Sequence, residues 1–224
     1  MKIEAEGIIA LCENTNTEVY AGIYFTSGTL HNKPVVVAVC GVGKVNASMC
    51  ALAMIEKYKP KAVINSGVAG AVSPLLRVGD IVVAEKSVEH DMNTTALGDI
   101  QGEISFPSGK VMYFDCDPEI VQLLTSVCRN IPETKVLNGV VASGDLFVSS
   151  VEQRLKINER FNALACEMEG AAIGHTCCCC NVPYGIIRAI SDDLTENEGM
   201  DFVKFTELAS KKSIRAIDSF VEKY

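Results

Sequence analysis

The sequence predicts an α/β fold in which a mainly parallel, buried sheet is flanked by helices. Short runs rich in valine and isoleucine alternate with stretches of helical periodicity, the pattern of repeated strand–helix–strand units. The chain has 224 residues, 48% of them hydrophobic and 21% charged, which is enough to bury one core. We therefore expect a single domain over residues 1–224.

The expected elements follow one another with no Ser/Gly-rich linker, low-complexity tract or repeat between them. Runs of β-branched residues predict strands at 18–30, 34–40, 61–67, 80–90, 135–143, 162–166 and 184–191. Apolar periodicity predicts helices at 44–58, 118–129, 150–159, 168–180 and about 201–222.

The composition excludes several classes of partner. The net charge is -8 and there is no run of Lys or Arg, so nothing favours nucleic acid or an anionic membrane surface. The longest apolar run, "PVVVAVC", is far shorter than the roughly 20 residues that span a bilayer, and "MKIEAEG" lacks a signal-peptide pattern. We expect a cytoplasmic protein whose ten cysteines are reduced.

Five segments that are polar or rich in glycine come directly after hydrophobic strands. They are "CGVGK", "NSGVAG", "SGDLF", "EMEG" and "SDD". In α/β sheets, ligands bind at the carboxyl edge of the strands, where loops converge and helix N-termini point their free N–H groups. Neither glycine-rich segment matches a phosphate-binding motif, but small residues let the backbone approach a flat or polar ligand closely. The sequence therefore predicts a small-molecule site at this edge.

Asp192 is the candidate acid of this site. It emerges beside Ser191 where the last predicted strand ends, so partial desolvation would raise its pKa and let it hold a proton for general acid catalysis. The alternative is that it caps the next turn. Glu167 and Glu169 lie at a strand-to-helix turn, where negative charge is also favoured by the helix dipole. If the helix begins by Met168, only one of the two glutamates is expected to meet the ligand.

The run Cys177 to Cys180 raises the question of a metal. Cys177 and Cys180 share a helix face, and His175 lies two residues before the run. A structural zinc site needs four ligands, however, and His31 and His90 are isolated in the sequence. We expect the cysteines to pack in the core as small apolar residues. A metal or redox centre is the alternative.

Six motifs together resemble a known family. "CGVGKVNA", "VINSGVAG", "VGDIVVAEKSVEHD", "SGDLFV", "ACEMEGAAIGH" and "VPYGIIRAISDD" are similar, in the same order, to signatures of the 5′-methylthioadenosine/S-adenosylhomocysteine nucleosidases of the nucleoside phosphorylase superfamily. The resemblance runs from about residue 17 to the C-terminus. It implies a three-layer α/β/α fold with a central mixed sheet partly closed into a barrel, a homodimer, and hydrolysis of the N-glycosidic bond of adenosine thioethers. It implies no metal and no organic cofactor.

The resemblance also implies roles for individual residues. Asp192 would protonate or hydrogen-bond purine N7, and Ser191 would help to orient it. Phe147 would stack on adenine while the Val148 backbone reads its Watson–Crick edge. Met168 and Glu169 would hold the ribose. Further substrate contacts would come from Val42, Val68, Ala69 and Arg188, and the thioether tail would meet the segment containing Leu97, Phe106 and Pro107, with the partner subunit completing that pocket.

The chain departs from the family at its N-terminus. The family begins with a strand, "MKIGIIGAM", and then has three glutamates, the last of which activates the attacking water. Here "MKIEAEG" lacks about six of those residues, so either the first strand is lost or a piece of it is missing from this sequence. When the chain is aligned on the residues after "EAE", Glu6 takes the water-activating position, with Glu4 beside it.

Two other functions stay open from sequence. A purine nucleoside phosphorylase would need a cationic phosphate clamp, but only six arginines occur and "NSGVAG" supplies none. A glutamate at the water position would also repel phosphate. A non-catalytic protein that binds adenosine ligands is compatible with the shortened N-terminus.

Overall fold

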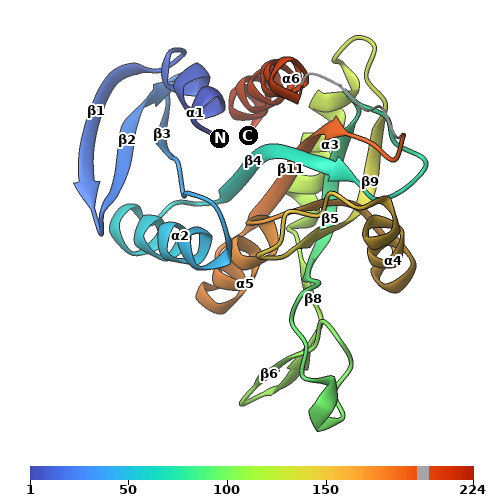
Figure 1. The fold of residues 1–224 in the computed structure, drawn as a ribbon. Helices are drawn as coiled ribbons and strands as arrows, with labels where there is room; N and C mark the ends of the chain where they lie inside the picture. The colour runs from blue at the N-terminus through green and yellow to red at the C-terminus, as the bar shows by residue number, and fades with distance from the viewer. Residues whose placement is uncertain (196–201) are drawn as a thin grey trace.

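The computed structural model describes residues 1–195 and 202–224, and the side chains of residues 202–206 are also outside the described set. Figure 1 shows the arrangement of the elements. The helices are α1 (Lys2–Ile9), α2 (Lys44–Tyr58), α3 (Pro118–Arg129), α4 (Val151–Phe161), α5 (Gly170–Cys180) and α6 (Phe202–Lys223). The strands are β1 (Glu13–Tyr20), β2 (Ile23–Leu30), β3 (Lys33–Ala38), β4 (Val63–Ala71), β5 (Ile81–Glu89), β6 (Ile104–Phe106), β7 (Gly109–Val111), β8 (Tyr113–Asp115), β9 (Val136–Ser143), β10 (Ala163–Glu167) and β11 (Tyr184–Asp192).

The central sheet is mixed and closes on itself. Its strand order is β11-β4-β10-β9-β5-β8, and an additional pairing between β11 and β5 closes five of these strands into a barrel. β4 and β10 pair antiparallel, as do β5 and β11, whereas β9 lies parallel to both of its neighbours. The expected mixed, partly closed sheet is therefore confirmed. Periodicity alone predicted a mainly parallel sheet, and that prediction missed the antiparallel pairs.

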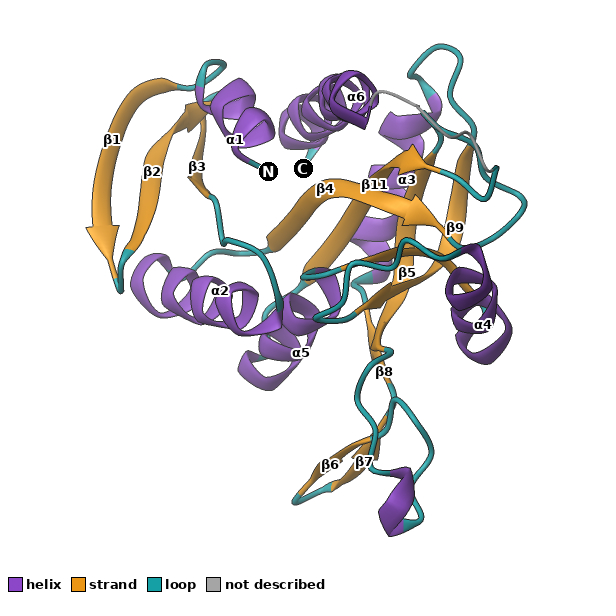
Figure 2. Cartoon of the chain, in the orientation of Figure 1, coloured by secondary structure: helices purple, strands orange, loops and turns teal. Residues whose placement is uncertain are grey.

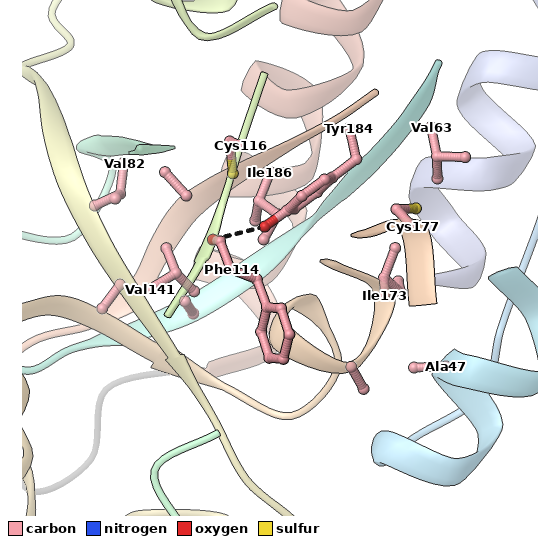
Figure 3. Packing of buried hydrophobic residues seen from close by; sticks show 14 of the residues in the cluster. Ala47, Val63, Val82, Phe114, Cys116, Val141, Ile173, Cys177, Tyr184 and Ile186 are labelled. Atoms are coloured by element: carbon pink, nitrogen blue, oxygen red, sulfur yellow. Dashed lines mark hydrogen bonds between the residues drawn. The ribbon is translucent and has the colours of Figure 1, made fainter. Parts of the chain in front are cut away.

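The core lies between the barrel and its helices. The residues of β11 are buried along almost the whole strand, as the continuous apolar run in "YGIIRAI" requires for a strand covered on both faces. Figure 3 shows one part of this core, where the Tyr184 hydroxyl donates a hydrogen bond of 2.7 Å to the Phe114 carbonyl. Cys177, Ile173 and Ala47 pack nearby in the same cluster, so α5 and α2 cover this side of the barrel.

The helix predictions agree closely with the structure. Helices α2 and α3 have the expected bounds, α4 differs by one residue at its start and two at its end, and α5 begins two residues later than expected. The expected first residue of the last helix, residue 201, lies outside the described residues. The expected strand at 18–30 is instead a hairpin, β1 and β2, whose turn residues Ala21 and Gly22 both have positive φ (51° and 77°). Such a two-residue turn reverses the chain without a break in the pattern of β-branched residues.

The N-terminal segment forms a helix, which the sequence analysis did not assign. Lys, Glu and Ala favour helix, and Lys2 pairs with Glu6 one turn later. α1 packs on α6 at Gly7, where a Cβ atom would lie 2.3 Å from the Ile214 side chain. Gly7 therefore permits the close approach of the two helices. No strand formed by these described first residues enters a sheet.

The cysteine run wraps around one turn of α5. Cys177 is buried in the core and Cys180 is half-buried, which confirms packing for these two. Cys178 and Cys179 are exposed, so the packing prediction is wrong for them. Four consecutive helical residues cover a full turn, and they cannot all face the core.

The segment between β5 and β8 projects away from the barrel. It carries the short hairpin of β6 and β7 and a 3-10 turn at Thr95–Leu97, as Figure 2 shows. Leu97 is 82% exposed. Among the described residues, no helix is both long and apolar enough to cross a membrane.

Candidate active site

One large cavity collects the five segments that the sequence predicted to converge. Its volume is about 1210 Å³. Four of the segments lie at or just past the carboxyl ends of β3, β9, β10 and β11, whereas "NSGVAG" lies within β4, which continues as far as Ala71. The predicted site residues that line the cavity are Val42, Val68, Ala69, Phe147, Val148, Met168, Glu169, Arg188, Ser191 and Asp192.

Asp192 lies at the end of β11, between two polar partners. The Ser191 hydroxyl donates a hydrogen bond of 2.7 Å to its Oδ1, and the Arg154 guanidinium forms an ion pair with its Oδ2. Its neighbour Asp193 instead accepts hydrogen bonds from the backbone and hydroxyl of Thr195 and so caps the next turn. Asp193, rather than Asp192, therefore caps the next turn.

Arg154 was not singled out from the sequence. It lies in the first turn of α4 and is 6% exposed. Besides the ion pair with Asp192, its Nε donates to the Val148 carbonyl at 2.9 Å and its Nη1 donates to the Asp193 carbonyl at 3.2 Å. The Arg154 guanidinium thus holds Asp192 in a fixed position relative to Val148, whose backbone is expected to contact adenine. A single arginine in an amphipathic helix gives no sequence signal of this role.

Glu167 and Arg188 form a buried ion pair at the base of the cavity. Both are almost fully buried, and the Ser143 hydroxyl and the Gly170 N–H also donate to the Glu167 carboxylate. Burial alone would raise the pKa of Glu167, but the Arg188 charge and these hydrogen bonds outweigh it and lower the pKa. Glu167 is therefore an ionised structural partner of Arg188, which agrees with its expected supporting role.

Glu169 is the more available of the two glutamates. It precedes the first turn of α5, and its Oε1 accepts a hydrogen bond of 3.0 Å from the Gly43 N–H. Burial and, secondarily, the negative charge of Glu167 raise the pKa of Glu169. The two glutamates therefore have pKa values pushed in opposite directions, which is a common signature of a functional site.

The structure separates Glu6 from the cavity and brings Glu4 to it. Glu6 lies on the exposed side of α1, where its side chain is 63% accessible and pairs with Lys2. Glu4 is 2% exposed, accepts a 3.2 Å hydrogen bond from the Ser66 hydroxyl, and lines the cavity with Arg188. Because the segment is a helix, residues two apart point in different directions. The alignment on "EAE" therefore selected the outward-facing glutamate.

The loop after β3 is held to the rest of the site by a polar network. The Lys44 N–H donates to Asp145 at 2.8 Å, and the Lys44 ammonium contacts Asp91 at 2.7 Å and Glu89 at 3.0 Å. The Asp145 N–H in turn donates to Asp91 at 2.8 Å. The ribose-side and adenine-side loops of the expected site are thus joined by one lysine, which the sequence analysis missed.

Two predicted substrate residues lie outside the cavity. Leu97 and Pro107 are on the projecting segment and do not line it. Phe147 and Val42 do line it, yet they are 63% and 68% exposed. The cavity is therefore open on the side of Phe147 and Val42.

The histidines and cysteines do not assemble into a ligand set. His175 donates to or accepts from Glu89 at 2.9 Å and stacks on Phe114, while His90 contacts Cys166. Within residues 1–195 and 207–224, no group of three or more His, Cys, Asp or Glu side chains is placed to hold a metal ion.

Fold and site together define an α/β protein with an acid at the end of a barrel strand and carboxylates across a shared cavity. The sequence profile of the Phosphorylase superfamily matches residues 1–222. The 5′-methylthioadenosine/S-adenosylhomocysteine nucleosidase of Oceanobacillus iheyensis is 36% identical over 204 residues, which cover 91% of this chain and 87% of that protein.

Solved structures agree with this assignment. The Neisseria meningitidis 5′-methylthioadenosine/S-adenosylhomocysteine nucleosidase in complex with methylthio-immucillin-A superposes with a TM-score of 0.92 at 32% identity, covering 100% of this chain and 96% of that one. The futalosine hydrolase of Helicobacter pylori gives a TM-score of 0.91 at 30% identity, covering 100% and 95%. The chain belongs to the phosphorylase superfamily and, within it, to the 5′-methylthioadenosine/S-adenosylhomocysteine nucleosidases.

Proposed function

We propose that this protein hydrolyses the N-glycosidic bond of 5′-methylthioadenosine and S-adenosylhomocysteine, releasing adenine and the 5-thioribose product. Such a reaction serves methionine salvage and the recycling of by-products of S-adenosylmethionine. The observation that carries the proposal is the placement of Asp192, which faces the same cavity as Glu169 and is held by Ser191 and Arg154. Family membership supports the same reaction.

The proposed chemistry begins at the leaving base. Cleavage of an N-glycoside develops positive charge on the sugar and negative charge on the base, so a proton delivered to the purine lowers the barrier. Asp192 supplies that proton or hydrogen bond at N7, and Ser191 orients the carboxyl group. Phe147 stacks on adenine, and the Val148 backbone contacts its polar edge.

The sugar is held by the opposite wall of the cavity. Met168 and Glu169 grip the ribose, with the Glu169 carboxylate accepting hydrogen bonds from its hydroxyls. Val42, Val68 and Ala69 approach the substrate through small side chains and backbone atoms. Negative charge beside the ribose stabilises the ribosyl cation-like state electrostatically.

We assign activation of the attacking water to Glu4 rather than Glu6. Glu4 is buried in the cavity, and its charge acts on the Arg188 guanidinium, whose Nε is buried without a hydrogen-bond partner among the described side chains. A water between them would receive a hydrogen bond from Arg188 Nε and give its proton to Glu4. Arg188 thus positions the water, while its Nη2 donates to both Glu167 and Asn65 and its Nη1 donates to the Ile187 carbonyl at 3.4 Å.

The test compares two glutamates on the same helix. Glu4→Gln is expected to lower kcat for methylthioadenosine by about 10²- to 10⁴-fold, the usual size of a general-base contribution. Glu6→Gln is the matched control and should retain activity within about twofold, because its side chain points to solvent. Loss of activity in Glu6→Gln with full activity in Glu4→Gln would reverse the assignment.

A phosphorylase reaction is disfavoured by the arginines of the cavity. Arg154 and Arg188 line it, and both are already paired with carboxylates, Asp192 and Glu167. Neither offers the free cationic clamp that phosphate requires. Adenine release measured with and without inorganic phosphate decides the question: the expected rate is the same in both, and phosphate-dependent release would favour the phosphorylase. A protein that only binds adenosine ligands would bind methylthioadenosine without releasing adenine.

We also propose that two copies associate through α2 and the projecting segment. Val45, Met49 and Leu52 recur along one exposed side of α2 and are 70%, 50% and 47% exposed, and Leu97 is 82% exposed on the segment. The partner's Leu97 and Pro107 would then complete the pocket for the thioether tail. Light scattering of the native protein is expected to give twice the chain mass, and Met49→Lys should give the monomer.

A cytoplasmic location is the last element of the proposal. All ten cysteines are free thiols, which suits a reducing compartment. Fractionation of the cells that make the protein is expected to recover it with the cytoplasmic enzymes.

A further inference from the structure

Lys44 ties together the two parts of the chain that would hold adenine and ribose. It is the first residue of α2, its side chain is 17% exposed, and it is not among the described residues that line the cavity. Its contacts nevertheless lead to both sides of that cavity. They form two closed rings of hydrogen bonds and chain segments, which share the Lys44 ammonium. The first ring runs through the loop after β9, and the second runs through Glu169.

The first ring holds the loop that carries Phe147 and Val148. The Lys44 N–H donates to Asp145 Oδ1 at 2.8 Å, and the Asp145 N–H donates to Asp91 Oδ2 at 2.8 Å. The Lys44 ammonium donates to Asp91 Oδ1 at 2.7 Å, which closes the ring. Because Asp145 lies only two residues before Phe147, the ring sets the position of the side chain that would stack on adenine.

Glycine residues let the loops after β3 and β9 meet this closely. Gly43 has a φ of +92°, and a Cβ atom there would lie 2.8 Å from Asp145 Oδ1. A Cβ atom on Gly144 would lie 2.5 Å from His90 Nε2 and 3.1 Å from the Asp91 carboxyl carbon. A side chain at either position would therefore displace a carboxylate of the first ring.

The second ring holds the carboxylate that would grip the ribose. The Gly43 N–H, one residue before Lys44, donates to Glu169 Oε1 at 3.0 Å, and Glu169 directly precedes α5. Further along α5, His175 Nδ1 lies 2.9 Å from Glu89 Oε1, while Glu89 Oε2 accepts a 3.0 Å hydrogen bond from the Lys44 ammonium. Figure 1 shows α2 and α5 beside each other, and the ring connects the two helices.

The charges at the shared point support one another. Burial would lower the pKa of Lys44, but its hydrogen bonds with Asp91 and Glu89 outweigh burial and raise the pKa. Burial would likewise raise the pKa of each carboxylate, and their hydrogen-bond partners, Lys44 among them, lower it instead. Hydrogen bonds between charged groups are shorter and stronger than those between neutral ones. A neutral side chain in place of the ammonium would therefore open both rings at once.

We propose that Lys44 is a positioning residue for the hydrolysis: through the two rings it holds the Phe147 loop and the Glu169 carboxylate in one fixed geometry, which aligns the leaving base and the ribose in the transition state. The inference rests on the proposed function, because the groups that Lys44 positions are those assigned there to adenine and ribose. A displacement of about 1 Å can lower the rate of the chemical step by about 10²-fold. Lys44 should therefore affect kcat more than KM.

The first test compares two lysines of the same helix. Lys44→Met removes the ammonium and keeps an unbranched side chain, so kcat for methylthioadenosine should fall by about 10- to 100-fold while KM changes by less than about fivefold. Lys44→Arg keeps a charged donor and should recover at least about threefold of that kcat. Lys57→Met is the matched control: Lys57 is 28% exposed and pairs with Glu18 at 2.6 Å, and its loss should leave kcat within about twofold.

A second measurement separates the two rings. Adenine has no ribose, so its dissociation constant, measured by titration calorimetry, reports on the Phe147 loop alone. Asp91→Asn opens the first ring, and both it and Lys44→Met should weaken adenine binding about fivefold. Glu89→Gln weakens only the second ring, so it should lower kcat and leave the adenine Kd within about twofold. Urea unfolding of every variant fixes a temperature at which all of them are folded.

The outcomes distinguish this inference from the proposed function. If kcat of Lys44→Met equals that of Lys57→Met, or if Lys44→Arg recovers nothing, Lys44 does not position the site. If the wild-type chain releases no adenine from methylthioadenosine, the proposed function fails, whereas calorimetry still tests the positioning of the loop. An adenine Kd in Lys44→Met and Asp91→Asn equal to that of the wild type would then overturn the inference.

Discussion

The polar end of the cavity and its part between β3 and β4 are built in different ways. At the polar end, two arginines are each paired with a carboxylate of the same chain: Arg188 with Glu167, and Arg154 with Asp192. The part between β3 and β4 is lined mostly by apolar residues of β3, α2 and α6, with Glu4 of α1 among the exceptions. Because a buried polar group without a partner costs free energy, the paired charges preorganise the polar end, whereas the apolar part imposes few fixed polar contacts.

The largest expected effect tests the polar end directly. Asp192→Asn removes the proton donor and leaves the side-chain size unchanged, so kcat for methylthioadenosine should fall by about 10³-fold or more. Adenine release measures it. Asp193→Asn is the matched control, because the Asp193 side chain caps a turn and its carbonyl contact with Arg154 is kept in the variant, so most activity should be retained. Full activity in Asp192→Asn would show that Asp192 is not the general acid.

The next effect concerns the folding stability that the polar end supplies. Arg188→Met leaves Glu167 buried without its cation, which should cost about 3–5 kcal/mol of unfolding free energy in urea titration. Combining it with Glu167→Gln should recover part of this loss, since the second change removes the stranded charge. If the loss of stability in the double variant equals the sum of the losses in the two single variants, the pair is not coupled.

Two alanines of the same core cluster contrast the cavity wall with a filled core. Ala51 of α2 is 4% exposed and lines the cavity, whereas Ala172 of α5 is 2% exposed and does not line it. Ala51→Leu should change the unfolding free energy by less than about 1 kcal/mol, because there is space for the larger side chain. Ala172→Leu should cost about 1–3 kcal/mol through overpacking. Similar costs for both would mean that the cavity beside Ala51 is closed in solution.

The smallest expected effect is a shift in the pH profile. Glu169 must be ionised to accept hydrogen bonds from the ribose, and burial, together with the smaller effect of the Glu167 charge, raises its pKa above the ordinary 4.5. Activity should therefore fall as the pH decreases, with the midpoint of kcat/KM above 4.5. The acid limb should be absent from the residual activity of Glu169→Gln. A midpoint at or below the ordinary glutamate value would assign the limb to another group.

The same contrast separates the features that the sequence could predict from those it could not. Asp192 and Glu169 were found because polar residues after β-branched runs must collect at one edge of a sheet. Arg154 and Lys44 were missed, since a cation reaching across from another element leaves no local pattern. Glu6 was preferred to Glu4 because the alignment carried no information about which side of α1 faces the cavity. The size of the cavity depends on elements far apart in the sequence, and only their arrangement reveals it.

The two exposed thiols on α5 can be labelled selectively. Five of the ten cysteines are buried and three are half-buried, which leaves Cys178 and Cys179 as the accessible pair. Burial raises the pKa of Cys178, which slows its reaction with a maleimide dye. A dye on Cys179 would lie about 15 Å along the helix from Glu169, at 1.5 Å per residue. A spectroscopic reporter of ligand binding is therefore available without introducing a cysteine.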